Sequence, residues 1–453
     1  MPRTLVPSKS DTLYSSHVNP QWLRLLELVQ MNVTYSHCLG AELFLPGDRR
    51  ILDFLSGYCV HNVGHNHPRI VEAIKDELDR MGPAMLQSHV SELAGDLGAR
   101  LCERAGGRLA KVFFSSSGSE GVEAAIKFAR AHTGRSGLLY AEGAFHGLTC
   151  GALSLMGNSS WREGFGPLLP ETEPVPFGSI DDLEKKLSTK RFAAFFVEPI
   201  QGEGGVRLPS PGYLEAAQSL CRRHGTLLVL DEVQTGLYRT GHFLASHPYG
   251  LEPDMVVLAK ALSGGLIPSG ALLMTDAVYE SVYSSLNRAI VHTSTYSENS
   301  LAMRAGLATL DVLEEERLGE RSLRLGEYLR RRLREELAGY EMVQKVRGAG
   351  LFCGIEFTAP QHWKLRIPFE SFTKIHPALF GQALVAQLFR EKGILTQICG
   401  NNFRVLKVAP PLVIKEDHLE EGIRAIREVV EEMHSSTGFW SEAWGIARRA
   451  INI

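Results

Sequence analysis

Three short apolar runs, each ending in a charged residue, constrain the fold of this chain more than any other feature. They are residues 193–198, 226–231 and 255–260. Short runs rich in branched and aromatic residues are typical of buried strands. Their last residues lie 33 and 29 positions apart, spacings that fit parallel strands joined by crossovers. Ligands bind beyond the carboxyl ends of such strands, so we expect Glu198, Asp231 and Lys260 to converge on one crevice.

Lys260 has two interpretations. A lysine at a strand end is most often solvated, since lysines are seldom fully buried. A desolvated lysine, in contrast, loses its proton readily and can form a Schiff base with a carbonyl. Carboxylates at the ends of two other runs favour the second interpretation, because buried charges are costly without a role around a ligand.

Composition excludes several classes of protein. The 453 residues suggest about 2–3 domains, and 44% apolar residues are enough for a full core. The net charge of −3 predicts neither a nucleic acid nor an anionic membrane as partner. Seven dispersed cysteines without a CxxC pair argue against disulfides and a zinc site. Without a secretory signal or an apolar segment of membrane-spanning length, a cytoplasmic protein is expected.

The pattern along the chain predicts a domain organisation. Helices alternate with short apolar runs from about residue 69 to 330, as in α/β folds. Residues 301–340 predict a long helical stretch, residues 359–378 an irregular segment, and the last residues, 438–453, a segment docked on the body. We expect three parts: residues 1–68 packing with a small domain, a large domain of residues 69–330, and a small α+β domain of residues 331–453.

The segment Lys111–Arg130 predicts a strand, a turn of small residues and a helix. Ser117 and Glu120 fit a capping box. The turn offers free backbone N–H groups at the positive end of a helix, which suits a phosphate. An ordinary capped helix is the alternative. The spacings GxGxxG and GxxxxGK[ST] are missing, which argues against dinucleotide or P-loop binding.

Two further motifs complete a possible site. Phe145 lies in Gly-Ala-Phe-His-Gly, where its ring offers either a flat wall for a ligand or plain core. Glu203 lies in a glycine-rich loop, where a solvated position explains it equally well. A phosphate turn, a flat aromatic ring, a carboxylate and a lysine at one sheet edge are the parts that pyridoxal phosphate needs.

These residues resemble the class III pyridoxal-phosphate aminotransferases, from about Asn19 to Met433. The resemblance rests on SSSGSEGVEAAIKFAR, GAFHG, EPIQGEGGV, LDEVQTGLYRTG, LAKALSGGLIPSGA and HTSTYSEN, in that order along the chain. It implies an α/β fold of fold type I, with a large domain around a mostly parallel sheet. The N- and C-terminal segments would form the smaller α+β domain.

The resemblance also implies a role for each matching residue. Lys260 would form the Schiff base and later move a proton, and Asp231 would keep the pyridine nitrogen protonated. The remaining cofactor-binding residues follow from the same motifs: Gly118, Ser119 and Ser117 at the phosphate, Phe145 and Val233 on opposite ring faces, Gln234 at the ring hydroxyl, and His146 and Glu198 around the ring. Thr295 would reach the phosphate of a neighbouring subunit, which implies a homodimer with shared sites.

The substrate side is less uniform. Several stretches, among them Gly400-Asn-Asn402, resemble putrescine and other diamine aminotransferases, whereas Tyr58 resembles a substrate contact of ornithine aminotransferases. The family usually has an arginine before its PPL motif, where it grips a carboxylate and can pair with the glutamate matching Glu203. Here that residue is Lys407, which cannot make a planar two-pronged contact. Arg404 would face the opposite side of the strand.

The sequence therefore predicts a pyridoxal-phosphate transaminase. It would move the terminal amine of a diamine or ω-amino acid (putrescine-like, ornithine or acetylornithine) to 2-oxoglutarate, pyruvate or a similar 2-oxo acid. One alternative is an aminomutase or another amine or amino-acid enzyme on the same cofactor and fold, which would need no external oxo acid. Another is a catalytically silent binding protein of this fold. No metal is predicted, since His65 and His67 are more simply explained by a turn.

Overall fold

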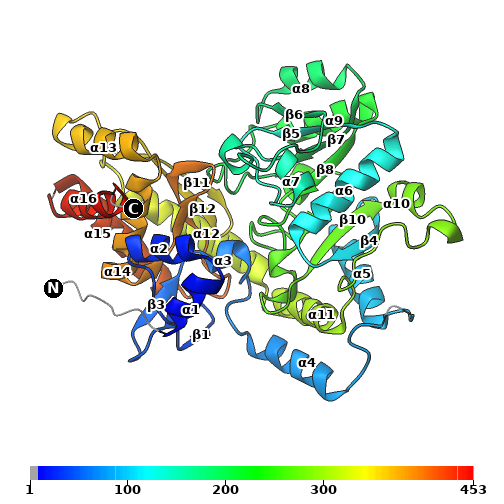
Figure 1. Cartoon of the computed structure of the whole chain (residues 1–453), viewed down its shortest axis with the longest axis horizontal. Helices are drawn as coiled ribbons and strands as arrows, with labels where there is room; N and C mark the ends of the chain where they lie inside the picture. Colours follow the sequence, from blue (N-terminus) through cyan, green and yellow to red (C-terminus); the bar gives the residue numbers. More distant parts are fainter. Residues whose placement is uncertain (1–8, 87, 436, 452–453) are drawn as a thin grey trace.

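The computed structural model describes residues 9–86, 88–435 and 437–451. Figure 1 shows two lobes, one coloured mostly cyan to green and one that combines N-terminal elements in blue with C-terminal elements in orange and red. The first lobe is built on a seven-stranded sheet of order β4-β10-β9-β8-β7-β5-β6. Its strands are β4 (Leu109–Ser115), β5 (Gly137–Ala141), β6 (Thr172–Val175), β7 (Phe192–Val197), β8 (Leu227–Asp231), β9 (Met255–Leu258) and β10 (Gly270–Thr275).

The sheet is mostly parallel, as expected. Strands β6, β5, β7, β8 and β9 run parallel to their neighbours, and β10 pairs antiparallel with both β9 and β4. All residues of β5, β7, β8, β9 and β10 are buried, which explains their unbroken apolar sequence. The three runs noted in the sequence therefore lie on adjacent strands and end at one edge.

Helices cover both faces of this sheet (Figure 1). Alternate residues of each strand belong to two separate apolar clusters, one of which includes α6 and α10. The helices of this lobe are α4 (Pro68–Asp79), α5 (Glu92–Ala105), α6 (Gly118–Thr133), α7 (Cys150–Ser154), α8 (Ile180–Leu187), α9 (Tyr213–His224), α10 (Asp276–Val282) and α11 (Ser300–Glu315).

The second lobe combines the two ends of the chain. Its sheets have the orders β11-β12-β15-β14 and β1-β2-β3-β13, and the second joins the ends because Leu52 of β3 pairs with Ile394 of β13. The strands are β1 (His37–Leu39), β2 (Glu42–Phe44), β3 (Arg50–Asp53), β11 (Val343–Ala349), β12 (Phe352–Phe357), β13 (Ile394–Leu395), β14 (Gln397–Cys399) and β15 (Asn402–Val408). The helices are α1 (Lys9–His17), α2 (Pro20–Leu28), α3 (Ser56–Cys59), α12 (Leu318–Glu336), α13 (Trp363–Ile375), α14 (Leu379–Lys392), α15 (Glu416–Ser435) and α16 (Thr437–Ile451).

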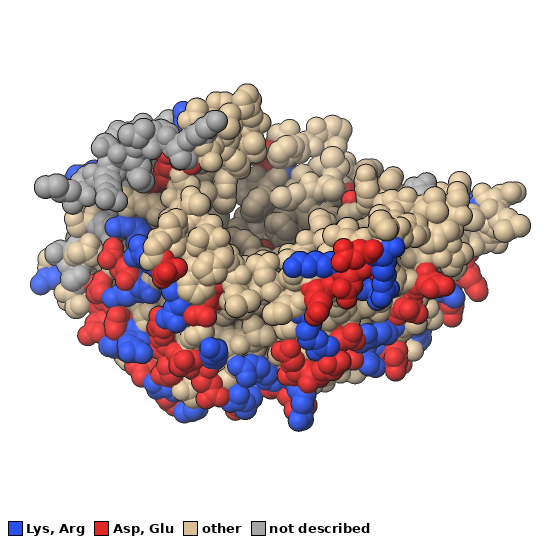
Figure 2. Space-filling model, turned by 90° about the horizontal axis from the view of Figure 1, so that it is seen from below, with Lys and Arg blue, Asp and Glu red and all other residues tan. Residues whose placement is uncertain are grey.

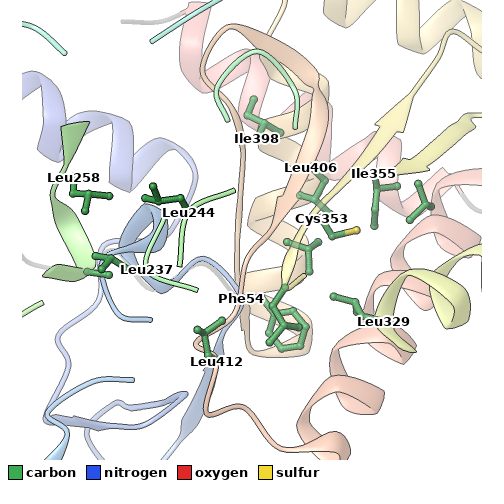
Figure 3. Close-up of a cluster of buried hydrophobic side chains, with 14 of the residues drawn as sticks. Phe54, Leu237, Leu244, Leu258, Leu329, Cys353, Ile355, Ile398, Leu406 and Leu412 are labelled. Atoms are coloured by element: carbon green, nitrogen blue, oxygen red, sulfur yellow. The ribbon is translucent and has the colours of Figure 1, made fainter. Parts of the chain in front are cut away.

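One apolar core continues from the first lobe into the second. Figure 3 shows Leu258 of β9 and Leu237 on one side, Phe54 and Leu412 in the middle, and Ile355 of β12 on the other. All of these side chains are buried. The lobes are therefore joined by packed side chains as well as by the chain itself.

Two expectations about single elements were wrong. Residues 301–340 form two helices, because Arg317 adopts a left-handed conformation (φ +51°) between α11 and α12. Residues 359–378 are not irregular, since they contain α13 despite Pro368. Leu365, Phe369 and Phe372 recur at helical spacing and pack into the core, which outweighs the proline. Residues 437–451 form α16, which contacts α14 and α15 as expected of a docked segment.

Figure 2 shows a hollow in one face of the molecule, walled mainly by uncharged residues, with acidic and basic side chains interspersed over another part of that face. None of the described helices is long and apolar enough to cross a lipid bilayer.

Candidate active site

A cavity of about 460 Å³ lies at the edge of the large sheet where β7, β8 and β9 end. Its walls include ten of the residues predicted from the sequence, and an eleventh lies directly behind them. These are Ser117, Gly118, Ser119, Phe145, His146, Glu198, Asp231, Val233, Gln234 and Lys260, joined by Glu203 through its hydrogen bond to Gln234. Glu198, Asp231 and Lys260 therefore line one cavity, as predicted.

Lys260 begins a short 3₁₀ turn two residues beyond β9. Its backbone is left-handed (φ +50°), a conformation that non-glycine residues hold only when their surroundings impose it. Burial lowers the pKa of its amine, and the carboxylates of Glu203 and Asp231 oppose this shift only in part. The lysine at this strand end is therefore a half-buried residue in the cavity wall, and partial desolvation lowers the pKa of its amine.

Asp231 is the last residue of β8 and is 5% exposed. Its Oδ2 accepts a hydrogen bond from Nδ1 of His146 at 2.8 Å, and its Oδ1 accepts one from the backbone N–H of Val233 at 3.0 Å. Burial lowers the pKa of His146, but the hydrogen bond and charge of Asp231 and the charge of Glu198 outweigh it, so the net shift is upward.

Glu198 stands one residue beyond β7 and is 3% exposed. Its two oxygens accept backbone N–H bonds from Phe145 at 3.0 Å and Gly202 at 2.9 Å. Burial raises its pKa to about 7, with His146 opposing and Asp231 adding to the shift. Glu198 therefore fastens the Phe145 loop to the loop that carries Glu203.

The turn before α6 forms the opposite wall. Ser117 caps the helix by accepting from the N–H of Glu120 at 3.2 Å, and Glu120 reaches back to the N–H of Ser116 at 2.8 Å, which confirms the capping interaction. A Cβ at Gly118 would lie 2.9 Å from Val233. Only glycine keeps the turn this close to the chain that follows Asp231, and the free N–H groups of the turn stay open to the cavity.

Three buried polar side chains form the other end of the site. Nζ of Lys407 is bonded to Oε1 of Glu203, and Nε2 of Gln234 donates to the same oxygen at 3.1 Å. Lys407 is fully buried and Glu203 is 6% exposed. Despite burial, each charge stabilises the other, so the pKa of Glu203 is lowered and that of Lys407 is raised. Both amide atoms of Gln234 are engaged here, since Lys407 also donates to its Oε1 at 3.4 Å.

Tyr58 lies over this ion pair, with Nζ of Lys407 5.1 Å from the centre of its ring. Ser56, Gly57, Tyr58 and Cys59 all have positive φ, between +46° and +68°. Asp53 supports this strained segment by accepting the N–H groups of Leu55 and Ser56. Arg404 is exposed beside the ring of Phe369, as strand alternation predicted, and does not reach Glu203.

Thr295 is not brought to this cavity within one chain. It is exposed and lines a second cavity between α4, α5 and the segment before α11. The sequence reasoning also assigned no role to Trp161 and Asn401, which hydrogen bond to each other beside Phe145. Asn401 lies in a turn and Trp161 in a 3₁₀ helix of three residues, and such short segments carry no periodicity.

The family model for class III aminotransferases matches residues 27–430. The chain is 35% identical to the aminotransferase PigE from a Serratia species over 461 aligned residues, covering 94% of this chain and 54% of PigE. The chain thus spans about half of the length of that curated relative. Among solved structures, ornithine aminotransferase from Toxoplasma gondii is 30% identical (TM-score 0.78; 89% of this chain, 91% of that one). An amine transaminase from an uncultivated Pseudomonas species is 28% identical (TM-score 0.79; 88% and 95%).

The chain belongs to the class III aminotransferases. Its cofactor is accordingly pyridoxal phosphate, and the fold is the α/β fold of its structural relatives. The cavity of this aminotransferase has three features that fit pyridoxal phosphate: a lysine amine with a lowered pKa, a buried carboxylate and an open helix N-terminus. Nε2 of His146 is buried without a hydrogen-bond partner among the described residues.

Proposed function

We propose that this aminotransferase transfers the terminal amino group of a diamine or ω-amino acid to a 2-oxo acid such as 2-oxoglutarate or pyruvate. The donor class includes putrescine-like amines, ornithine and acetylornithine. The observation that carries the proposal is the placement of a partly desolvated lysine, Lys260, in one cavity with Asp231 and the capped turn before α6. Relatives named ornithine aminotransferase and amine transaminase support the substrate class.

Pyridoxal phosphate, when bound, supplies an aldehyde and an electron-withdrawing ring. In the proposal Lys260 binds the aldehyde, because its lowered pKa leaves a larger share of the amine unprotonated and nucleophilic. The amine of Lys260 would also serve as general base and acid, moving a proton at the substrate carbon. Its left-handed backbone beyond β9 determines the direction in which the side chain leaves the main chain.

Asp231 and the turn before α6 would hold the two ends of the cofactor. The carboxylate of Asp231, oriented by its hydrogen bond with His146, suits a protonated ring nitrogen. The N–H groups and hydroxyls of Ser117–Ser119 suit the phosphate. Phe145 and Val233 line the same cavity and offer apolar contacts to the ring.

The substrate end favours amines that carry no carboxylate near the reacting nitrogen. The charge of Lys407 is already neutralised by Glu203, and Tyr58 covers the pair. Lys407 should therefore bind a substrate carboxylate less well than an arginine, whose guanidinium group makes two parallel hydrogen bonds. Gln234, Glu203 and Tyr58 present polar atoms that suit a distal amine or hydroxyl.

We further propose a homodimer in which Thr295 completes the site of the neighbouring subunit. Large apolar side chains are strongly exposed in the single chain. Val90 (91%) and Ile290 (80%) line the same cavity as Thr295, and Met81 (90%) and Leu286 (94%) are close in sequence to residues of that cavity. Exposed apolar surface of this extent is typical of a protein interface. We also propose that residues 1–68 and 331–453 form one unit, which the pairing of β3 with β13 supports.

The test is a panel of amine donors assayed against pyruvate and 2-oxoglutarate, with the absorbance of the cofactor followed in parallel. We expect turnover with diamines or ω-amino acids and complete loss with Lys260→Ala. Borohydride should attach the cofactor to Lys260 in the wild type and leave the variant unlabelled. Turnover of an amine without any oxo acid would favour an aminomutase, and a wild type inactive on every donor would refute the proposal.

A further inference from the structure

Asn401 occupies the turn between β14 and β15, within the Gly400-Asn-Asn402 stretch. Its Nδ2 donates to the carbonyl oxygens of Gly143 at 3.1 Å and Ala144 at 3.0 Å. Its Oδ1 accepts from Nε1 of Trp161 at 2.9 Å. Its backbone N–H donates to the carbonyl oxygen of Glu203 at 2.9 Å. One residue of the second lobe thus contacts three loops of the first.

The orientation of this amide is determined by its partners. The indole N–H of Trp161 can only donate, and the two backbone carbonyls can only accept. The side-chain oxygen must therefore face Trp161, and the nitrogen must face Gly143 and Ala144. A carboxylate in the same place would accept from Trp161 but would set an oxygen against the two carbonyls.

Two of these three segments carry a residue of the active site, and the third carries Trp161, which supports one of them. The loop of Gly143 and Ala144 leads directly into Phe145, and the indole of Trp161 packs edge-on against the ring of Phe145 at 5.8 Å and 88°. The remaining segment carries Glu203, whose Oε2 also accepts from the N–H of Gly400 at 2.7 Å. The ring wall and the buried ion pair are therefore positioned by the same turn.

The contact leaves little free space. A Cβ added to Gly400 would lie 3.1 Å from Oε2 of Glu203 and 3.6 Å from Trp161. The turn is thus packed between the carboxylate and the indole, and a displacement of Asn401 moves both.

We infer that Asn401, held by Trp161, is a positioning residue that sets the Phe145 ring and the Glu203 carboxylate relative to each other. It touches neither the cofactor nor the substrate in this scheme. It acts on cofactor retention through Phe145 and on recognition of the substrate end through Glu203. The inference rests on the proposed function, in which these two residues bind cofactor and substrate.

The test compares Asn401→Asp and Trp161→Phe in the holoenzyme. Trp161→Phe keeps an aromatic ring beside Phe145 and removes one hydrogen bond, so kcat/KM should fall about threefold to tenfold. Asn401→Asp loses two donor contacts and gains repulsion, so kcat/KM should fall about 30-fold to 100-fold. In both variants KM for the amine donor should rise, and the cofactor should dissociate faster on dialysis.

Two matched controls separate positioning from general damage. Asn402→Asp introduces the same charge one residue away, where the side chain accepts only from the N–H of Arg404 in the described structure. Trp363→Phe alters a 63% exposed tryptophan on α13. Both should keep KM and cofactor retention within twofold of the wild type.

The inference is overturned if Asn401→Asp retains wild-type KM and cofactor retention, or if Asn402→Asp loses as much. A lower melting temperature with unchanged kinetics per loaded site would also overturn it. Inactivity of the wild type on every amine refutes the proposed function instead, and the dialysis comparison still tests the positioning of Phe145.

Discussion

At the scale of single residues, the most consequential side chain is the fully buried Lys407. Removing an ammonium from water costs several kcal/mol, and the ion pair with Glu203 offsets this only because hydrogen bonds satisfy the other polar atoms. Here the N–H of Gly400 and the amide of Gln234 make these additional hydrogen bonds to Glu203. The polar atoms of the ion pair are thus satisfied by one another and by these two groups, and the charge of Lys407 is already neutralised by Glu203 before a substrate binds.

Lys407→Arg should restore a two-pronged contact for a carboxylate. We expect kcat/KM for 2-oxoglutarate to rise about tenfold, the amount that one additional charged hydrogen bond provides. The half-reaction with putrescine, which has no carboxylate, serves as the control and should change little. No gain for 2-oxoglutarate would show that Lys407 already binds the carboxylate as well as an arginine does.

At the scale of elements, α12 packs directly on the turn between β11 and β12. A Cβ built on Gly326 of α12 would lie 1.8 Å from the carbonyl oxygen of Gly350. Arg330, one turn further along the helix, is bonded to the same oxygen. The helix therefore needs glycine at this position in spite of its poor helix propensity.

Gly326→Ala should destabilise the protein by about 1–3 kcal/mol, since helix and turn must move apart. Gly95→Ala is the matched control, because its added methyl group meets nothing within 4 Å in α5. That change should stabilise the protein by about 0.5–1 kcal/mol through helix propensity alone. Urea unfolding of both variants measures the difference, and equal effects would contradict the packing argument.

Some helices and strands could be predicted from the sequence, and others could not. Strands β7, β8 and β9 are buried on both faces, so their apolar runs and the polar residues after them were recognisable. Helix α13 was not predicted, although Leu365, Phe369 and Phe372 recur at helical spacing around Pro368. Asn401 lies in a stretch singled out in the sequence, but its contact with Trp161 could not be predicted, since the two residues are 240 positions apart.

At the scale of the whole molecule, one buried arginine joins the lobes. Arg239 follows the Asp231–Gln234 segment and is fully buried. It donates to Oδ1 of Asn62 at 2.6 and 3.1 Å, to Oγ of Ser56 at 3.0 Å, and to the carbonyls of Pro410 at 2.6 Å and Leu351 at 3.1 Å. Because these partners come from both ends of the chain, the Tyr58 segment and the strand end after Lys407 are fixed to the lobe that carries Lys260.

The last prediction concerns assembly. The segment between α10 and α11 extends from the edge of the first lobe in Figure 1 and exposes Leu286 and Ile290. Ile290→Asp would place a charge in the proposed interface, where an unpaired carboxylate is strongly unfavourable. We expect monomers in sedimentation velocity and loss of most transaminase activity, because Thr295 would no longer reach the neighbouring site.

Ile367→Asp is the control, since Ile367 is 60% exposed on α13 in the other lobe. It should leave both the sedimentation coefficient and the activity unchanged. A monomeric Ile290→Asp variant with full activity would contradict shared sites while leaving the interface intact as a proposal. If the Ile290→Asp variant stays dimeric, the dimer interface lies on another surface. The two readouts therefore test the interface and the role of Thr295 separately.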